Sequence, residues 1–295
     1  MTESRMPGAG PGTVSPGTVP LGTVPLDNLL GSIVPGCKLA LPPDYGGVAV
    51  AATLALIERH PEDLHLICLP SSGLQADMLI AAGCVARIET AAVTLGEAGL
   101  APAFTQAAKT GRLQVLDATC PALHAGFQAA EKGVPFMPLR GVIGSDILRN
   151  RRDWKVIENP FPESTEDRRI LAVPAIRPDV ALFHAPRADR FGNVWIGRRR
   201  ELASLAHAAR TTLVTVEETI EGDLLADEAS AAGVLPALYV SAVAVLPGGA
   251  RPLGLQDLYD PEPEAVAAWA QAGGAGNWDG AFAAVRRAIG EASAA

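Results

Sequence analysis

The sequence is poor in charged and in aromatic side chains. Only 19% of its 295 residues are Asp, Glu, Lys or Arg and 5% are Phe, Trp or Tyr, whereas 48% are hydrophobic. A chain with so many apolar residues can bury a large core, which excludes a wholly disordered protein. The net charge of −8 argues against nucleic acid or an anionic membrane as the main partner, because both attract a basic surface.

Uninterrupted hydrophobic runs and an export signal are also missing. Two uncharged stretches, residues 6–26 and 229–250, reach the ~20 residues that a membrane span requires. Five prolines break the first stretch, and one glycine and two prolines reduce the second to an apolar core at 237–246. We therefore expect neither segment to enter a membrane and place the protein in the cytoplasm.

Metal-binding patterns are absent as well. The four cysteines, Cys37, Cys68, Cys84 and Cys120, show no C-x-x-C spacing, and the five histidines have no metal-ligand spacing. In the reducing cytoplasm such cysteines are expected to remain buried thiols. We predict no metal site and no permanently bound cofactor.

The N-terminal region differs in composition from the rest of the chain. A five-residue unit repeats there as PGTVS, PGTVP and LGTVP, with turn-forming residues at every step. We expect residues 1–30 to form a disordered Pro/Gly-rich tail. No clean linker interrupts the remaining sequence, so residues 31–295 are expected to form one domain.

Short apolar runs alternate with amphipathic stretches beyond the tail. Strands are expected at 38–41, 64–69, 85–93, 113–117, 180–184, 213–216 and 239–246, and helices at 48–59, 75–82, 102–109, 123–132 and 201–209. Such alternation indicates parallel β-α-β crossovers. The fold class is therefore α/β, an open and mostly parallel sheet with helices on both faces. The polar segment 159–169 is expected to be an exposed hairpin or excursion.

Common enzyme motifs such as G-x-G-x-x-G, Walker A, G-x-S-x-G and H-E-x-x-H do not occur. Open α/β sheets bind ligands at the carboxyl ends of their strands, so glycine-rich loops there are the candidate site. Four such loops are Asp44–Gly47, Ser71–Gly73, Gly96–Gly99 and Gly141–Asp146. Each alone can be a tight turn, but four loops on one edge favour a ligand groove.

These loops supply the candidate residues, because glycines permit close backbone approach and helix N-termini hold anionic oxygens. The candidate binding residues are Tyr45, Gly46, Gly47, Ser71, Ser72, Gly73, Gly144 and Ser145. Glu97, set between two glycines, can act as a nucleophile or general base if a pocket desolvates it. It can equally face water or cap the helix after Pro102. His184, at the end of an apolar strand, is interpreted as a core or loop residue.

Five longer segments carry a resemblance to a known family. They are ADMLIAAGCVARIE (76–89), GVPFMPLRGVIGSD (133–146), VPAIRPDVALFHAPRADRFGNVWI (173–196), TLVTVEETI (212–220) and PALYVSAVAVLPGGARP (236–252). Within the third, Ala188, Asp189, Gly192 and Asn193 match an A-D-x-x-G-N signature, whose main role is expected to be a tight turn. In this order the segments resemble the alpha (A) subunits of family I coenzyme A transferases, most closely those of the glutaconate CoA-transferase group.

The resemblance implies the CoA-transferase α/β fold and a chain that forms half of a heteromeric enzyme. The implied partner is a beta subunit, and the implied substrates are an acyl-CoA, which brings the coenzyme A, and a carboxylic acid. In this family the attacking glutamate lies on the beta subunit, so the alpha subunit forms the other wall of the cleft. One loop departs from the pattern: Pro-Pro-Asp-Tyr-Gly-Gly stands where alpha subunits usually have a Gly-Gly-Phe-Gly type loop, and Tyr45, Gly46 and Gly47 can substitute for it.

Two alternatives remain open. A related branch of ring-opening hydrolases that act on CoA thioesters also resembles these subunits, and it uses an alpha-subunit glutamate in the loop that corresponds to Glu97. The chain can also be a non-catalytic subunit that keeps the fold without the site. Arginines at 149, 151, 152 and 198–200 can meet CoA phosphates, although exposed, solvated charge is the simpler role.

Overall fold

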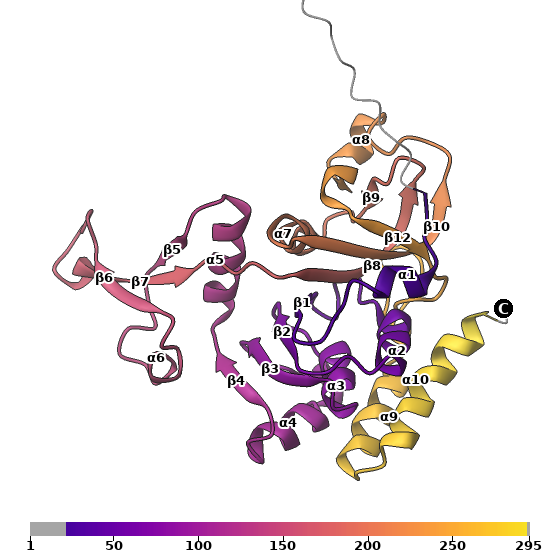
Figure 1. Ribbon diagram of the computed structural model, residues 1–295, viewed down its shortest axis with the longest axis horizontal. Coiled ribbons are helices and arrows are strands. Elements are labelled where there is room, and N and C mark those ends of the chain that lie inside the picture. Colours follow the sequence, from indigo (N-terminus) through magenta and orange to yellow (C-terminus); the bar gives the residue numbers. More distant parts are fainter. Residues whose placement is uncertain (1–21, 294–295) are drawn as a thin grey trace, which may run out of the picture.

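The centre of the protein is a nine-stranded sheet (Figure 1). The computed structural model describes residues 22–293. The strands are β1 (Lys38–Leu41), β2 (Leu64–Cys68), β3 (Val85–Thr90), β4 (Gln114–Asp117), β8 (Val180–Asp189), β9 (Val194–Trp195), β10 (Thr211–Ile220), β11 (Val234–Leu235) and β12 (Ala242–Val245). Their order is β11-β9-β8-β1-β2-β3-β4, and β10 lies between β8 and β12. All pairs are parallel except those made by the short β9 and β11.

Helices cover both faces of this sheet, as the sequence predicts. Leu39 and Leu41 of β1 face one core, and Ala40 between them faces the other, because successive strand residues point to opposite sides. The first core is closed by α2 (Val50–Glu58), α3 (Leu74–Ala81), α4 (Pro102–Lys109), α9 (Pro263–Gly274) and α10 (Trp278–Ser293), and the second by α5 (Cys120–Glu131) and α7 (Arg200–Ala208). The α/β fold class is confirmed. No helix within residues 22–293 has the length and apolarity to cross a membrane.

The expected tail extends too far along the chain. Residues 1–21 lie outside the described part, but Leu26–Leu30 forms the short helix α1. Leu29 and Leu30 are buried in the first core, and the backbone N–H of Val24 donates to the carbonyl of Val243 at 2.8 Å. The last part of the expected tail, residues 26–30, is therefore ordered, because two adjacent leucines after the repeats find an apolar site to fill.

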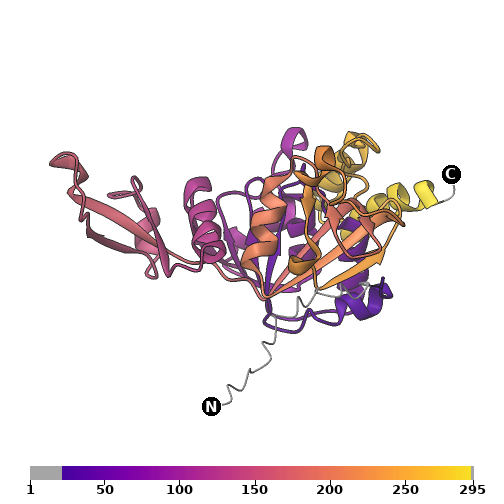
Figure 2. The same cartoon turned by 90° about the horizontal axis from the view of Figure 1, so that it is seen from above.

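A second, three-stranded sheet projects from the main body (Figure 2). It pairs β5 (Phe136–Leu139), β7 (Arg169–Pro174) and β6 (Lys155–Glu158) in that order, all antiparallel. The short helix α6 (Ile147–Asn150) and the 3₁₀ turn η2 (Glu166–Arg168) lie in its connections. The segment between β6 and β7 closes a hairpin, which confirms the expected excursion at 159–169. The sequence does not predict the strands of this sheet, because they lack the continuous apolar runs of buried parallel strands.

The A-D-x-x-G-N segment forms the turn between β8 and β9. The Asp189 carboxylate accepts hydrogen bonds from the N–H groups of Phe191 and Asn193, from the Asn193 amide and from the N–H of Leu224, at 2.8–3.0 Å. The Asn193 side chain accepts from the N–H of Ala237, the first residue of the 3₁₀ turn η3 (Ala237–Tyr239). This buried cluster joins the β8–β9 turn to the chain before α8 (Glu228–Ala231) and after β11, which confirms the structural role of the signature.

Replacement of Asp189 should therefore destabilise the fold strongly. Asp189→Ala leaves several buried N–H groups without an acceptor, at a cost of ~1–3 kcal/mol each, so we expect the free energy of unfolding to fall by at least ~3 kcal/mol. The matched control is Asp227→Ala, which removes only an exposed N-cap bond to Ala229 and should cost about 1 kcal/mol. Urea denaturation measures both, and equal losses would contradict the role of Asp189.

Candidate active site

Three of the four glycine loops meet at the carboxyl edge of β1, β2 and β3. The Asp44 carboxylate accepts hydrogen bonds from the N–H groups of Gly73 at 2.8 Å and Leu74 at 3.0 Å, and the Asp44 N–H donates to the Ser71 carbonyl. A Cβ atom on Gly73 would lie 2.0 Å from the carbonyl oxygen of Thr94. Only glycine permits this approach, so the loop after β3 lies directly beside the first two.

The other candidates in these loops have defined positions. Ser72 is fully buried, and its hydroxyl lies 2.8 Å from the Pro42 carbonyl and 2.7 Å from the Leu69 carbonyl. Gly47 adopts a positive φ of 82°, where a Cβ atom would lie 2.2 Å from the His184 carbonyl oxygen. Ser72 and Gly47 are therefore packed inside this edge of the sheet. The Tyr45 side chain is 54% exposed to solvent.

The fourth loop, Gly141–Asp146, lies elsewhere. It follows β5, which belongs to the projecting antiparallel sheet and not to the main sheet. The expectation that all four loops share one edge is therefore wrong for this loop. Gly144 and Ser145 do not follow a strand of the main sheet, and the Ser145 hydroxyl donates to the Val142 carbonyl at 2.7 Å within its own turn.

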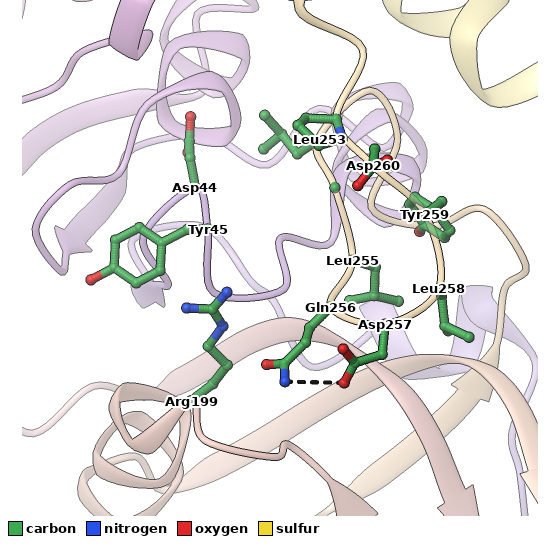
Figure 3. Close-up of a pocket in the computed structure, with 12 residues that line it drawn as sticks. Asp44, Tyr45, Arg199, Leu253, Leu255, Gln256, Asp257, Leu258, Tyr259 and Asp260 are labelled. Atoms are coloured by element: carbon green, nitrogen blue, oxygen red, sulfur yellow. Dashed lines mark hydrogen bonds between the residues drawn. The ribbon is translucent and has the colours of Figure 1, made fainter.

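A pocket of about 550 Å³ opens beside the first loop (Figure 3). Asp44, Tyr45 and Arg199 form one side of it, and the segment 253–261 forms the other. The Arg199 guanidinium lies 5.2 Å from the centre of the Tyr45 ring, a distance typical of a cation–π contact. A guanidinium at the mouth of a mixed polar and apolar pocket is suited to hold a carboxylate or phosphate.

The pKa of the Asp44 carboxyl group is shifted toward neutral pH. Burial raises the pKa of its carboxyl group to about 7, against the opposing effect of the hydrogen bonds from Leu74 and Gly73. Both oxygens accept from backbone N–H groups, so the group links the two loops and lines the pocket at the same time. A carboxyl group with such a pKa can exchange a proton near physiological pH.

A buried polar cluster lies behind this pocket. His184 Nε2 and the Tyr259 hydroxyl each lie 2.7 Å from Glu217 Oε1, and the N–H of Gly248 donates to Glu217 Oε2 at 2.7 Å. Burial by itself would raise the pKa of Glu217, but these three hydrogen bonds lower it. The other His184 nitrogen pairs with the Thr215 hydroxyl at 2.8 Å, so His184 is a satisfied, fully buried residue as predicted.

Several residues of the site are not predicted from the sequence. Glu217 and Tyr259 carry no motif, and neither does the pocket segment 253–261, which is far in sequence from the glycine loops. A carboxylate directly after the buried run of β10 is the available signal for Glu217, since the carboxyl ends of parallel strands share one edge. The sequence marks Arg199 only as one of several arginines.

Glu97 lies in the 3₁₀ turn η1 (Gly96–Ala98), and its side chain is exposed. Within residues 22–293 it is not among the residues that line the 550 Å³ pocket. No group of three or more His, Cys, Asp or Glu side chains in the described part of the chain is arranged to hold a metal ion.

The raised pKa of Asp44 predicts a pH-dependent stability. Between pH 3.8 and about 7 the folded state retains a proton that the unfolded chain has released, so the stabilisation is complete below pH 3.8 and is lost as the pH rises to 7. The measurement is the difference between the melting temperatures of the wild type and of Asp44→Asn. We expect this difference to decrease as the pH rises from 3.8 to about 7.

Glu217→Gln provides a control of opposite sign. Because the pKa of Glu217 is lowered, its contribution to the free energy of unfolding should be present above pH 4.5 and be lost as the pH falls below that value. A melting-temperature difference for Asp44→Asn that stays constant from pH 4 to 7 would contradict the assignment.

Comparison with known proteins agrees with this architecture. Residues 46–245 match the family model described as Coenzyme A transferase. The chain is 33% identical over 229 residues to the A subunit of 3-oxoadipate CoA-transferase from Pseudomonas knackmussii, a match that covers 75% of this chain and 77% of that one. It is 30% identical to the A subunit of glutaconate CoA-transferase from Acidaminococcus fermentans, over 64% of this chain and 63% of that one. It is also 28% identical to the cholesterol ring-cleaving hydrolase IpdA subunit of Rhodococcus jostii, over 68% and 70%.

Solved structures show the same fold. The decarboxylase AibA/AibB matches with a TM-score of 0.78 and 28% identity, over 91% of this chain and 98% of that one. Glutaconate CoA-transferase of Acidaminococcus fermentans matches with a TM-score of 0.78 and 25% identity, over 86% and 84%. The family model covers well over half of the chain, and the resemblance drawn from the five sequence segments is confirmed. The chain belongs to the coenzyme A transferase family.

Proposed function

We propose that this chain is the alpha subunit of a heteromeric CoA-transferase that moves coenzyme A between an acyl-CoA and a carboxylic acid. A beta subunit would complete the enzyme and supply the attacking glutamate, and the cytoplasm would be its location. The pocket lined by Asp44, Tyr45, Arg199 and the segment 253–261 would be this chain's share of the active-site cleft.

The observation that carries the proposal is that the carboxylates near the carboxyl edge either accept several hydrogen bonds or are exposed to solvent. Asp44 accepts two backbone N–H groups, and Glu217 accepts three hydrogen bonds. Asp257 and Asp260, which also line the pocket, are exposed to solvent. A nucleophilic carboxylate has to be desolvated and free of strong donors, and none of these four meets both conditions. The lining therefore favours a nucleophile from a partner.

The chemistry divides between the two subunits. A partner glutamate oxygen would attack the thioester carbonyl, and the C–S bond would break to give an acyl–glutamyl anhydride and the CoA thiolate. The thiolate would then attack the glutamyl carbonyl, release the donor acid as a carboxylate and leave a glutamyl-CoA thioester. The acceptor carboxylate reverses both steps. In each half the protein has to hold a carboxylate beside an electrophilic carbonyl, for which Arg199 is suited.

Arg199→Gln tests that role. Loss of the guanidinium should raise the KM for the carboxylate substrate by about tenfold or more, because a charge-assisted pair contributes ~1.5–3 kcal/mol. The adjacent Arg198 is exposed and does not line the pocket, so Arg198→Gln is the matched control and should leave KM within about twofold. Steady-state kinetics of the complete heteromer measures both, and equal KM values for the two variants would contradict the role.

A hydrolase that uses Glu97 is the second candidate, and the likeness to the IpdA subunit is the observation that favours it. In that reaction Glu97 would act as the base toward the CoA thioester or its ring carbons. A third possibility is a non-catalytic subunit that keeps the fold without the site. The exposed position of Glu97 outside the pocket lining favours the transferase, in which this side chain has no chemical step.

Glu97→Gln separates these functions. In a transferase the variant should still form the covalent CoA adduct on the partner and should lose less than about tenfold in turnover, whereas a catalytic base contributes ~10²–10⁴-fold. The adduct is measured by mass spectrometry after incubation of the heteromer with acyl-CoA, and Glu218→Gln, an exposed glutamate at the end of β10, is the control. A hundredfold loss for Glu97→Gln, with no adduct on the partner in the wild type, would establish the hydrolase instead. Absence of both adduct and turnover in the wild-type heteromer would indicate the non-catalytic subunit.

A further inference from the structure

A polar groove of about 610 Å³ lies over one face of the main sheet, against β1 to β4. Its floor is a row of side chains in register on four adjacent strands, in which Lys38 pairs with His65, His65 with Arg87 and Arg87 with Gln114. Neighbouring strands lie about 4.8 Å apart, so the row extends about 14 Å across the sheet. It shares no lining residue with the pocket of Figure 3.

This row is unusual for a parallel sheet, whose faces are normally covered by apolar packing. Two residues further along β1 and β2, on the same face, Ala40 and Ile67 are buried in the second core. The polar row lies just outside that core. The groove is thus an opening between the main sheet and the projecting sheet.

The far wall of the groove is held rigidly. The Arg151 side chain is 3% exposed, and its guanidinium donates to Glu89 of β3 at 2.7 Å and to Asp153 at 2.8 Å and 3.0 Å. It also stacks 4.2 Å from the Trp154 ring. The sequence favours an exposed role for this arginine, but Arg151 is buried, links the projecting segment to β3 and lines the groove.

The groove carries a net positive charge in an acidic protein. Five of its lining residues are Lys or Arg and two are Asp or Glu, whereas the whole chain has a net charge of −8. Both carboxylates, Glu89 and Asp153, are paired with Arg151. Within residues 22–293, neither Lys38 nor Arg87 forms a salt bridge, and Arg87 Nε donates to the neutral Gln114 side chain at 2.8 Å.

His65 is the most informative member of the row. Its Nε2 atom is inaccessible to solvent and has no hydrogen-bond partner in the described part of the chain. A buried ring nitrogen without a partner is costly. Burial and, to a smaller extent, the charges of Arg87, Lys38 and Arg151 together lower the pKa of His65 to about 4, against the opposing effect of Asp179. The ring therefore lies in a positive field and lacks a partner.

We propose that this groove binds a phosphate-bearing anion, with Lys38 and Arg87, on either side of the His65 ring, as its charged donors. A phosphate group presents several acceptor oxygens and up to two charges to the cationic side chains of β1 and β3, whereas a carboxylate presents two oxygens and one charge. The phosphate can be inorganic or part of a nucleotide, and the site is separate from the proposed cleft. It does not depend on the proposed transferase activity.

Calorimetric titration of the full chain, in the complex in which it purifies, tests the site. At constant ionic strength and pH 7.5 we expect saturable binding of inorganic phosphate, with acetate at least tenfold weaker. Arg87→Gln and Lys38→Gln should each weaken phosphate binding at least tenfold. Lys109→Gln, which removes an exposed charge at the end of α4, should leave the affinity within about twofold. Unchanged melting temperatures of the two groove variants would show that they fold.

The outcomes are distinct. If inorganic phosphate binds as tightly as adenosine 3′,5′-bisphosphate, the ligand is free phosphate. If the bisphosphate binds tenfold tighter, the ligand is a nucleotide phosphate. The His65 ring resonances should shift on titration at fixed pH, and those of the buried His184 should not. Equal affinities for phosphate and acetate, no saturable binding, or equal effects of Arg87→Gln and Lys109→Gln would overturn the proposal. Transferase activity enters none of these readouts.

Discussion

The hydrogen bonds from the N–H groups of Gly73 and Leu74 to the Asp44 carboxylate hold the carboxyl edge of the sheet together. They join the loop after β1 to the loop after β2 and to the start of α3. They also keep Gly73 against the Thr94 carbonyl in the loop after β3. The bond from the Asp44 N–H to the Ser71 carbonyl and the bond from the Ser72 hydroxyl to the Pro42 carbonyl join the same loops. The carboxylate is buried by the same packing that makes it a link, and this burial raises its pKa toward neutrality.

Two carboxylates at this edge, those of Glu217 and Asp189, are already bound within the fold. Glu217 accepts hydrogen bonds from His184 and from the Tyr259 hydroxyl behind the pocket. Asp189 accepts hydrogen bonds from Asn193 within the β8–β9 turn. Buried carboxylates that accept several hydrogen bonds are stable as acceptors and poor as nucleophiles. This state of the carboxylates agrees with the proposal that the attacking carboxylate belongs to a partner subunit.

Two openings flank the same sheet and differ in chemistry. The pocket at the carboxyl edge has one arginine among apolar and carboxylate-bearing residues, whereas the groove has a row of donors and unpaired positive charge. The pocket lies beyond the carboxyl ends of the parallel strands, which meet at one edge, whereas the groove lies over one face of β1 to β4. The Arg151–Glu89 ion pair, which joins the projecting sheet to β3, gives the groove its second wall.

Local sequence was sufficient for the α/β class, for most buried strands and helices, and for the turn at Asp189 and Asn193, because hydrophobic period and turn chemistry are encoded within short segments. It also placed Tyr45–Gly47, Ser71–Gly73 and Gly96–Gly99 at strand ends. It could not assign Gly141–Asp146 to a separate sheet or extend order back to Leu26, since strand partners and the burial of Leu29 depend on distant residues. For the same reason Glu217, Tyr259 and the row from Lys38 to Gln114 emerged only from the tertiary structure. Pairing between parallel strands and the position of segment 253–261 bring together side chains that no local pattern connects.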